Sequence, residues 1–282
     1  MPAAFVGHEL YRRPAYGANH PLAIPRVETA TDLARALGWL RDDALHASPR
    51  ADDAVLERFH TADYVRALRS ACERGEVSAA TRARHRIGTM ENPLFPGLFE
   101  RAATCVGGSI LAAQLALNGR IAFHPAGGTH HGRPDHASGF CYFNDPVFAM
   151  LTLLDVGVDR LLYADLDAHH CDAVQDAFDG DPRVFTVSIH ERDRWPHTGA
   201  AADTGSGGRA CNLPVPRGFN DSELELLLDA VVLPIAESVA PQAVVLTCGA
   251  DALAGDPLSA MALSNVALWS AVDRLARVAP QV

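Results

Sequence analysis

Short, almost uninterrupted runs of hydrophobic residues alternate along the chain with longer segments in which hydrophobic positions recur at helical spacing. Runs with few polar positions are typical of parallel strands that are buried on both faces. Four runs are predicted strands: residues 120–124, 160–165, 183–190 and 243–248. The helical spacing predicts helices over residues 29–40, 53–74, 96–118, 145–156, 221–239 and 264–278.

This alternation of strands and helices predicts the α/β class, with one central, mostly parallel sheet and helices on both of its faces. The composition does not change abruptly along the chain, so we expect a single domain over residues 1–282. In such a sheet, ligands bind beyond the carboxyl ends of the strands. The loops that follow three of the predicted strands are rich in Gly, His and Asp, and candidate chemistry is therefore sought there.

Composition excludes several classes of protein. The chain is 48% hydrophobic and 21% charged, which is ordinary globular usage. It has no long apolar stretch and no basic leader, so we expect neither a membrane span nor a signal peptide. Six cysteines without a CxxC pair indicate a reducing cytoplasm. The net charge of −10 argues against nucleic acid as a partner, because phosphate binding needs clustered cations. All 24 cationic residues are arginine, so lysine-based catalysis is excluded.

Acidic and histidine side chains gather at the end of the predicted strand 160–165. Asp165, Asp167 and His169 alternate in an extended run and therefore project to the same side. Asp251 follows another predicted strand and could supply a further ligand. Two carboxylates and an imidazole with one open position are typical of a catalytic zinc or iron site.

Two adjacent histidines, His130 and His131, follow a Gly-Gly turn. If Asp167 and His169 bind a metal, Asp165 and Asp172 are left as carboxylate partners that could orient imidazole rings. An Asp–His pair raises the basicity of the ring, as activation of a water molecule requires. We therefore predict that the histidines are a proton-transfer pair, with Asp165 behind His130 and Asp172 behind His131.

Two neighbouring segments give weaker signals. Phe140 lies in a glycine-bearing loop, where it could either line a substrate channel or pack in the core. Glu191 and Asp193, in the HERDR segment, are expected in a solvated loop.

Five motifs resemble those of the zinc-dependent histone deacetylase family in the arginase–deacetylase superfamily, particularly its bacterial acetoin-utilisation branch. In chain order they are PAGGTHH, SGFCYFND, YADLDAHHCDAVQDAF, FTVSIHE and GADALAGDPL. The resemblance extends from about Tyr11 to the last residue. It implies a hydrolase that removes acetyl or other acyl groups from lysine side chains of proteins.

The resemblance also implies roles for individual residues. Asp167, His169 and Asp251 would bind Zn²⁺, with Fe²⁺ as an alternative, and His130, His131, Asp165 and Asp172 would be catalytic. The residues expected to contact the substrate are Glu91, Gly139, Phe140, Trp195 and Leu258. Arg26 would line the path by which acetate leaves. A structural K⁺ or Na⁺ would be bound by Asp165, Asp167, His169, Ser188 and Ile189.

Three departures from the family pattern affect these expectations. Cys171 and Ala173 replace glycines, which would strain the turn if either position needed a positive φ. Glu91 replaces a shorter aspartate. The family's GGGGY motif, which carries a catalytic tyrosine, does not occur in the sequence. We therefore expect the C-terminal strand and Gly-rich loop of the family to be missing from the 282 residues, so the activity of this chain remains open.

Three alternatives remain open. The substrate could be a small acylated amine such as an acetylpolyamine. The chain could also bind a metal and acyl-lysine without turnover, as a pseudoenzyme lacking the tyrosine. An arginase-like hydrolase with two manganese ions fits the HH, GFC and DPL motifs less well. The sequence does not indicate an oligomeric state.

Overall fold

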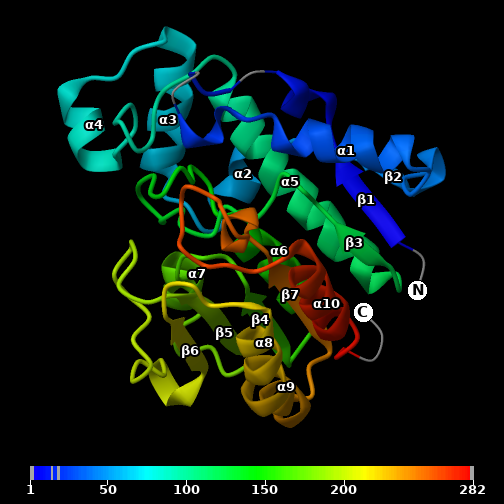
Figure 1. Ribbon diagram of the computed structural model, residues 1–282. Helices are drawn as coiled ribbons and strands as arrows, with labels where there is room; N and C mark the ends of the chain where they lie inside the picture. Colours follow the sequence, from blue (N-terminus) through cyan, green and yellow to red (C-terminus); the bar gives the residue numbers. More distant parts are fainter. Residues whose placement is uncertain (1–2, 14, 18–19, 280–282) are drawn as a thin grey trace. The chain divides into compact units, whose positions relative to one another are not determined.

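A computed structural model describes residues 3–13, 15–17 and 20–279 (Figure 1). The chain divides into two compact units, Met1–Thr152 and Leu153–Val282. Both contain parallel strands with helices packed against them, so the predicted α/β class is confirmed. Among the described residues, none of the helices combines the length and hydrophobicity that crossing a bilayer would require. A single domain over 1–282 stays a prediction.

The first unit has a three-stranded parallel sheet in the order β2-β1-β3. Its strands are β1 (Ala3–Gly7), β2 (Leu45–Ala47) and β3 (Ile121–Phe123). Of these three strands, only β3 was predicted. The helices are α1 (Arg26–Ala36), α2 (Asp53–Leu56), α3 (Ala62–Arg74), α4 (Ala79–His85), α5 (Leu98–Leu117) and α6 (Asp145–Asp155).

The helix predicted over 53–74 is interrupted, because the segment contains two N-caps. The Asp52 side chain accepts a hydrogen bond from the Val55 amide and starts α2. Thr61 accepts one from the Tyr64 amide and starts α3, which ends at Gly75 in the left-handed conformation. The apolar spacing continues across both helices, and so it conceals the break.

The second unit has a four-stranded parallel sheet in the order β6-β5-β4-β7. Its strands are β4 (Leu161–Asp165), β5 (Val184–Glu191), β6 (Ala210–Val215) and β7 (Ala243–Thr247). Its helices are α7 (Asp172–Ala177), α8 (Asp221–Leu227), α9 (Leu233–Val239) and α10 (Asn265–Ala276). A π-helical turn, Leu228–Val232, joins α8 to α9 just before Pro234, which cannot donate a backbone hydrogen bond.

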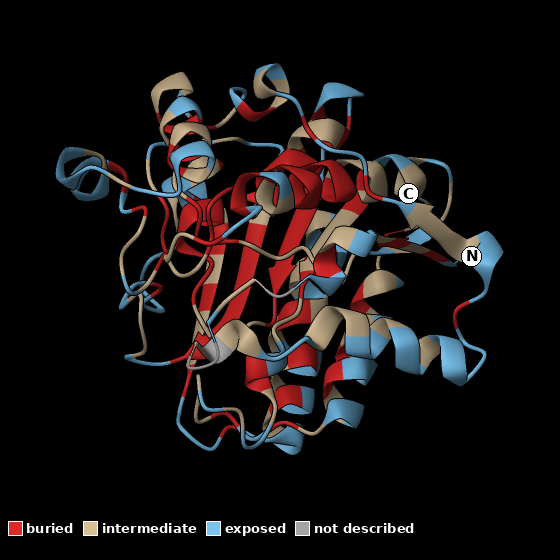
Figure 2. Cartoon of the chain, turned by 90° about the horizontal axis from the view of Figure 1, so that it is seen from above, coloured by how far each residue is buried: buried red, intermediate tan, exposed pale blue. Residues whose placement is uncertain are grey.

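All five residues of β4 are buried, as predicted for a central parallel strand. Leu162 and Ala164 belong to a hydrophobic cluster that includes residues of α8, α9 and α10, while Tyr163 and Asp165 face the opposite side of the sheet. Figure 2 shows buried residues running along whole strands. Asp165 pairs in register with Thr247 of β7, so β4 and β7 end at the same level, and with Ser188 of β5, which continues three residues further to Glu191. The loops that leave this edge carry the candidate metal ligands.

Candidate functional site

The predicted metal ligands of the second unit lie together. Asp167 and His169 are in the loop between β4 and α7, and Asp251 is in the short turn after β7. Their ligand atoms all lie within 4.8 Å of one another. The His169 Nδ1 atom is 3.0 Å from Asp167 Oδ1 and 2.9 Å from Asp251 Oδ2. Two carboxylate oxygens and a ring nitrogen are donors suited to a divalent ion such as zinc, so this donor set fits a metal.

Backbone amides fix the carboxylates. Asp167 Oδ1 accepts a hydrogen bond from the His169 amide at 2.8 Å, and Asp251 Oδ1 accepts one from the Ala168 amide at 3.1 Å. The side chains of Asp167, His169 and Asp251 are 16%, 15% and 9% exposed. The cluster is therefore preorganised, and its side chains are not fully closed off from solvent.

The two carboxylates of the cluster occupy space that is free only because residue 249 is a glycine. A Cβ atom at this position would lie 2.1 Å from Asp167 Oδ2 and 2.4 Å from Asp251 Oδ1. We expect Gly249→Ala to displace both carboxylates and to weaken metal binding by at least about 10-fold, the lower limit for disturbing the support of a ligand. Isothermal titration with Zn²⁺ measures this. Gly17→Ala is the matched control, because no described atom lies within 4 Å of its Cβ position. Equal affinity in the Gly249 variant and the wild type would contradict the steric argument.

The electrostatics of the cluster also favour a cation. Burial alone would lower the pKa of His169, but hydrogen bonds with Asp167 and Asp251 and their negative charges outweigh burial and raise the pKa to about 10. Burial, together with the charge of Asp167, raises the pKa of Asp251. Without an ion, a proton on His169 thus balances part of the carboxylate charge.

Ion binding at His169 must displace this proton. We expect the uptake of one Zn²⁺ at pH 7 to release about one proton from the ring, and affinity to rise about tenfold per pH unit until pH approaches 10. The raised pKa stabilises the ion-free fold fully below the ordinary pKa of about 6.5, and this contribution is lost as pH rises through 10. Calorimetry in buffers of different ionisation enthalpy counts the protons. A count of zero at pH 7 would contradict a protonated His169.

Asp165 and Asp172 flank the cluster in the chain. Asp165 Oδ2 accepts a hydrogen bond from the buried Tyr163 hydroxyl at 2.5 Å, and its Oδ1 accepts one from the Asp167 amide at 2.9 Å. Asp172 is the first residue of α7 and is buried. The strain considered for Cys171 and Ala173 does not arise, because Cys171 has a φ of −75° and Ala173 is helical. The structure therefore accommodates both departures from glycine.

The histidine pair lies in the first unit, in the loop between β3 and α6. His130 and His131 are both buried, and their ring centroids are 4.0 Å apart. The start of α6 holds this loop: Asp145 accepts hydrogen bonds from the Gly128 and Thr129 amides at 3.1 and 2.7 Å. The Asn144 side chain donates to the His130 carbonyl at 3.1 Å. The two rings are thus carried by a fixed backbone.

Residues predicted to contact substrate in the first unit are also brought together. The Gly139 amide donates to Glu91 Oε1 at 2.7 Å, and the Phe140 amide donates to Asn92 Oδ1 at 3.0 Å. Phe140 has a φ of +65°, which is unusual for a residue other than glycine. Glu91 and Asn92 therefore hold a strained turn that displays the half-buried Phe140 ring.

In the second unit, the expectation that Glu191 lies in a solvated loop is wrong. Glu191 ends β5 and is 3% exposed. Its carboxylate accepts hydrogen bonds from Arg194 Nε at 2.7 Å and from the Ala260 amide at 2.7 Å, while Arg194 Nη1 donates to the Leu258 carbonyl at 2.6 Å. Asp193 is exposed, as expected. The Glu191–Arg194 pair thus joins the loop carrying Trp195 to the loop carrying Leu258.

Removing Arg194 should leave the Glu191 carboxylate buried with fewer donors. We expect Arg194→Met to lower the free energy of unfolding by about 1–3 kcal/mol. Urea denaturation followed by circular dichroism measures the change. Arg192→Met makes the same change in charge at an exposed residue and should have little effect. Equal losses in the two variants would mean that the buried pair contributes nothing specific.

The remaining predicted residues have defined places within their units. The ring centroid of Trp195 lies 6.2 Å from that of His169. Ser188 and Ile189 are buried in β5, and Ser188 Oγ is 2.9 Å from His190 Nδ1. Arg26 is the first residue of α1 and is half-buried. The roles predicted for these residues stay predictions.

Comparisons with known proteins agree with the motifs. The family described as "Histone deacetylase domain" matches residues 20–282. Human histone deacetylase 1 is 37% identical over 257 residues, covering 88% of this chain and 53% of that protein. Histone deacetylase 6 of Arabidopsis thaliana is 38% identical over 258 residues, with 88% and 54% covered. The chain thus spans about half the length of these curated relatives.

Solved structures give the same result for the fold. The crystal structure of an HDAC homolog complexed with SAHA matches with a TM-score of 0.93 and 35% identity, covering 100% of this chain and 77% of the other. That of an HDAC homolog from Aquifex aeolicus matches with a TM-score of 0.94, at the same identity and coverage.

Proposed function

The chain belongs to the histone deacetylase family, and we propose that it is a zinc-dependent hydrolase that removes acetyl groups from lysine side chains of proteins. One observation carries the proposal: Asp167, His169 and Asp251 converge at the carboxyl edge of a parallel sheet with donor atoms that suit a divalent metal. We also propose that the protein is cytoplasmic. Its six cysteines are free and form no CxxC pair, as is typical of proteins in a reducing compartment.

The three ligands would hold zinc. A bound zinc ion would polarise the acyl carbonyl and lower the pKa of a water molecule. In our proposal His131 accepts the proton of the attacking water and later gives a proton to the leaving amine. His130 assists electrostatically as its oriented neighbour, and Asp165 and Asp172 support the pair.

Other side chains would bind and position the substrate. We propose that Gly139, Phe140, Trp195 and Leu258 enclose the acyl-lysine stem and that Glu91 accepts hydrogen bonds from the substrate backbone. Two further sites complete the proposal. Arg26 would line the path of the released acetate, and a K⁺ or Na⁺ would be bound by Asp165, Asp167, His169, Ser188 and Ile189.

A small acylated polyamine is the second candidate substrate. The net charge of −10 favours cationic partners, and a polyamine is cationic along its whole length. An acetyl-lysine peptide and N-acetylspermidine, each assayed with and without a chelator, separate the two. We expect chelator-sensitive hydrolysis with the higher kcat/KM for the peptide. A higher kcat/KM for the polyamine would favour the second candidate, and binding without hydrolysis of either substrate would overturn the enzymatic proposal.

A further inference from the structure

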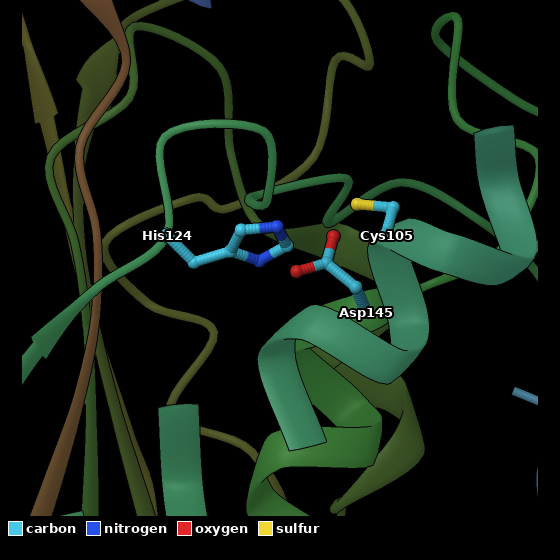
Figure 3. A group of neighbouring side chains, drawn as sticks. All are labelled: Cys105, His124 and Asp145. Atoms are coloured by element: carbon cyan, nitrogen blue, oxygen red, sulfur yellow. The ribbon is translucent and has the colours of Figure 1, made fainter. Parts of the chain in front are cut away.

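A second group of metal-binding residue types lies in the first unit. Cys105 belongs to α5, His124 follows β3, and Asp145 begins α6. The three side chains point toward one another (Figure 3), and their ligand atoms lie within 4.8 Å of each other. We propose that Cys105, His124 and Asp145 form a structural site for a divalent transition metal, with zinc as the preferred ion.

The donor set selects the class of ion. A thiolate and an imidazole favour zinc and related transition metals, whereas Mg²⁺ and Ca²⁺ prefer oxygen ligands alone. Cys105 and Asp145 are 6% and 1% exposed, so a metal-bound thiolate beside the carboxylate would need a cation to balance the two charges in the interior. A doubly charged cation balances one thiolate and one carboxylate, and the thiol proton is released to solvent when the Cys105–metal bond forms.

The spacing requires only a small closure. Zinc bonds of about 2.0–2.3 Å in a tetrahedron place ligand atoms about 3.3–3.8 Å apart, so side-chain adjustments of about 1 Å would complete the site. Ser109 Oγ already lies between two of the ligands, 3.0 Å from His124 Nδ1 and 2.5 Å from Asp145 Oδ2. Its hydroxyl is the group placed to take the fourth position.

The surroundings of His124 Nε2, the ring nitrogen that would not bind the metal, also support the proposed metal site. His124 Nε2 is buried and, among the described residues, has no hydrogen-bond partner, and the same holds for Ser48 Oγ. Both atoms lie within 2.7 Å of the point where a Cβ atom on Gly108 would stand. Metal binding at Nδ1 would leave the ring hydrogen on Nε2, and Ser48 Oγ is a polar atom on that side of the ring. A metal-bound histidine usually donates its other N–H to a nearby acceptor.

A Cys–His–Asp group can also activate a thiol nucleophile, but the surroundings of Cys105 argue against that role. Reactive cysteines are partly exposed. The Cys105 sulfur is buried and donates to the Ala126 carbonyl at 3.0 Å. An ion would instead fasten α5, the end of β3 and the start of α6, and so would brace the loop that carries the histidine pair.

Cobalt spectroscopy tests this site directly. The full chain is stripped with a chelator and reloaded with two equivalents of Co²⁺. Cobalt bound to a thiolate absorbs strongly in the near ultraviolet, whereas Asp167, His169 and Asp251 contain no sulfur and cannot produce this band. We expect the band in the wild type and two zinc ions per chain after reloading with Zn²⁺. Absence of the band from the wild type would overturn the proposal, whatever the variants show.

Single-residue variants show which cysteine supplies the sulfur that binds cobalt. Cys105→Ser should abolish the band and weaken binding at the second site by more than about 100-fold. Cys248→Ser is the matched control. This cysteine is close enough to the first cluster for the charges of Asp165 and Asp167 to act on it, so it is the thiol to exclude as a source of the band at that cluster. Loss of the band in Cys248→Ser, or its persistence in Cys105→Ser, would overturn the assignment. If Cys105→Ser does not fold, His124→Gln is used in its place. We expect the band to be lost in this variant as well, and a retained band would contradict the proposed site.

Discussion

Replacing Asp251 with Asn should remove one metal ion per chain and abolish hydrolysis while leaving the fold intact. Asp251 Oδ1 accepts a hydrogen bond from the Ala168 amide, and an Asn side chain can keep that contact. The variant loses the negative charge beside His169, whose Nδ1 is 2.9 Å from Asp251 Oδ2. We expect zinc content to fall by one equivalent and turnover to fall by more than about 100-fold, because the ion supplies several kcal/mol of stabilisation to the transition state.

Elemental analysis and a peptide deacetylation assay measure these two effects. Asp159→Asn makes the same chemical change at an exposed aspartate of the same unit and should leave both values unchanged. Circular dichroism shows whether the fold is retained. Full zinc content with normal turnover in Asp251→Asn would mean that Asp251 is not a ligand and that the proposed catalytic centre lies elsewhere.

The metal cluster could be predicted because its ligands follow a local rule. Asp167 and His169 alternate just beyond a buried strand, and Asp251 follows a second strand that pairs with the first in parallel. Parallel pairing brings such residues to one edge of the sheet without knowledge of any side-chain contact. The donor types then indicate the ion.

Features that depend on distant contacts could not be predicted in the same way. Gly249 begins the GADALAGDPL motif, but its steric role appears only in the space that its missing Cβ leaves to two carboxylates. Glu191 was interpreted as solvated because charged residues surround it in the sequence. Its burial depends on Arg194, three residues away, and on the Ala260 amide, 69 residues away. Only the tertiary structure brings that amide to the end of β5.

Strand prediction failed for a related reason. The segment that forms β6 contains Asn212 and Pro214, so it lacks the apolar run used to recognise the other strands. It is stabilised as the edge strand of its sheet by pairing with β5. Proline is tolerated at such an edge, where an amide hydrogen is not needed on the outer side.

His131→Ala should lower turnover by about 10²–10⁴-fold, the range for loss of a general base, while the metal remains bound. The proposed ligands Asp167, His169 and Asp251 are untouched by this change, so zinc content separates loss of the base from loss of the ion. We also expect the variant to lose the part of the pH–rate profile that reports deprotonation of the base.

His136→Ala is the control for His131→Ala. His136 lies in the same β3–α6 loop, but it is only partly buried and its Nδ1 is 2.6 Å from Asp135 Oδ1. Turnover in this control should stay close to that of the wild type. Near-normal turnover in His131→Ala with zinc in place would show that another group accepts the proton. The metal assignment would then still stand, because it rests on the Asp251→Asn result, whereas the role of the histidine pair would have to be reassigned.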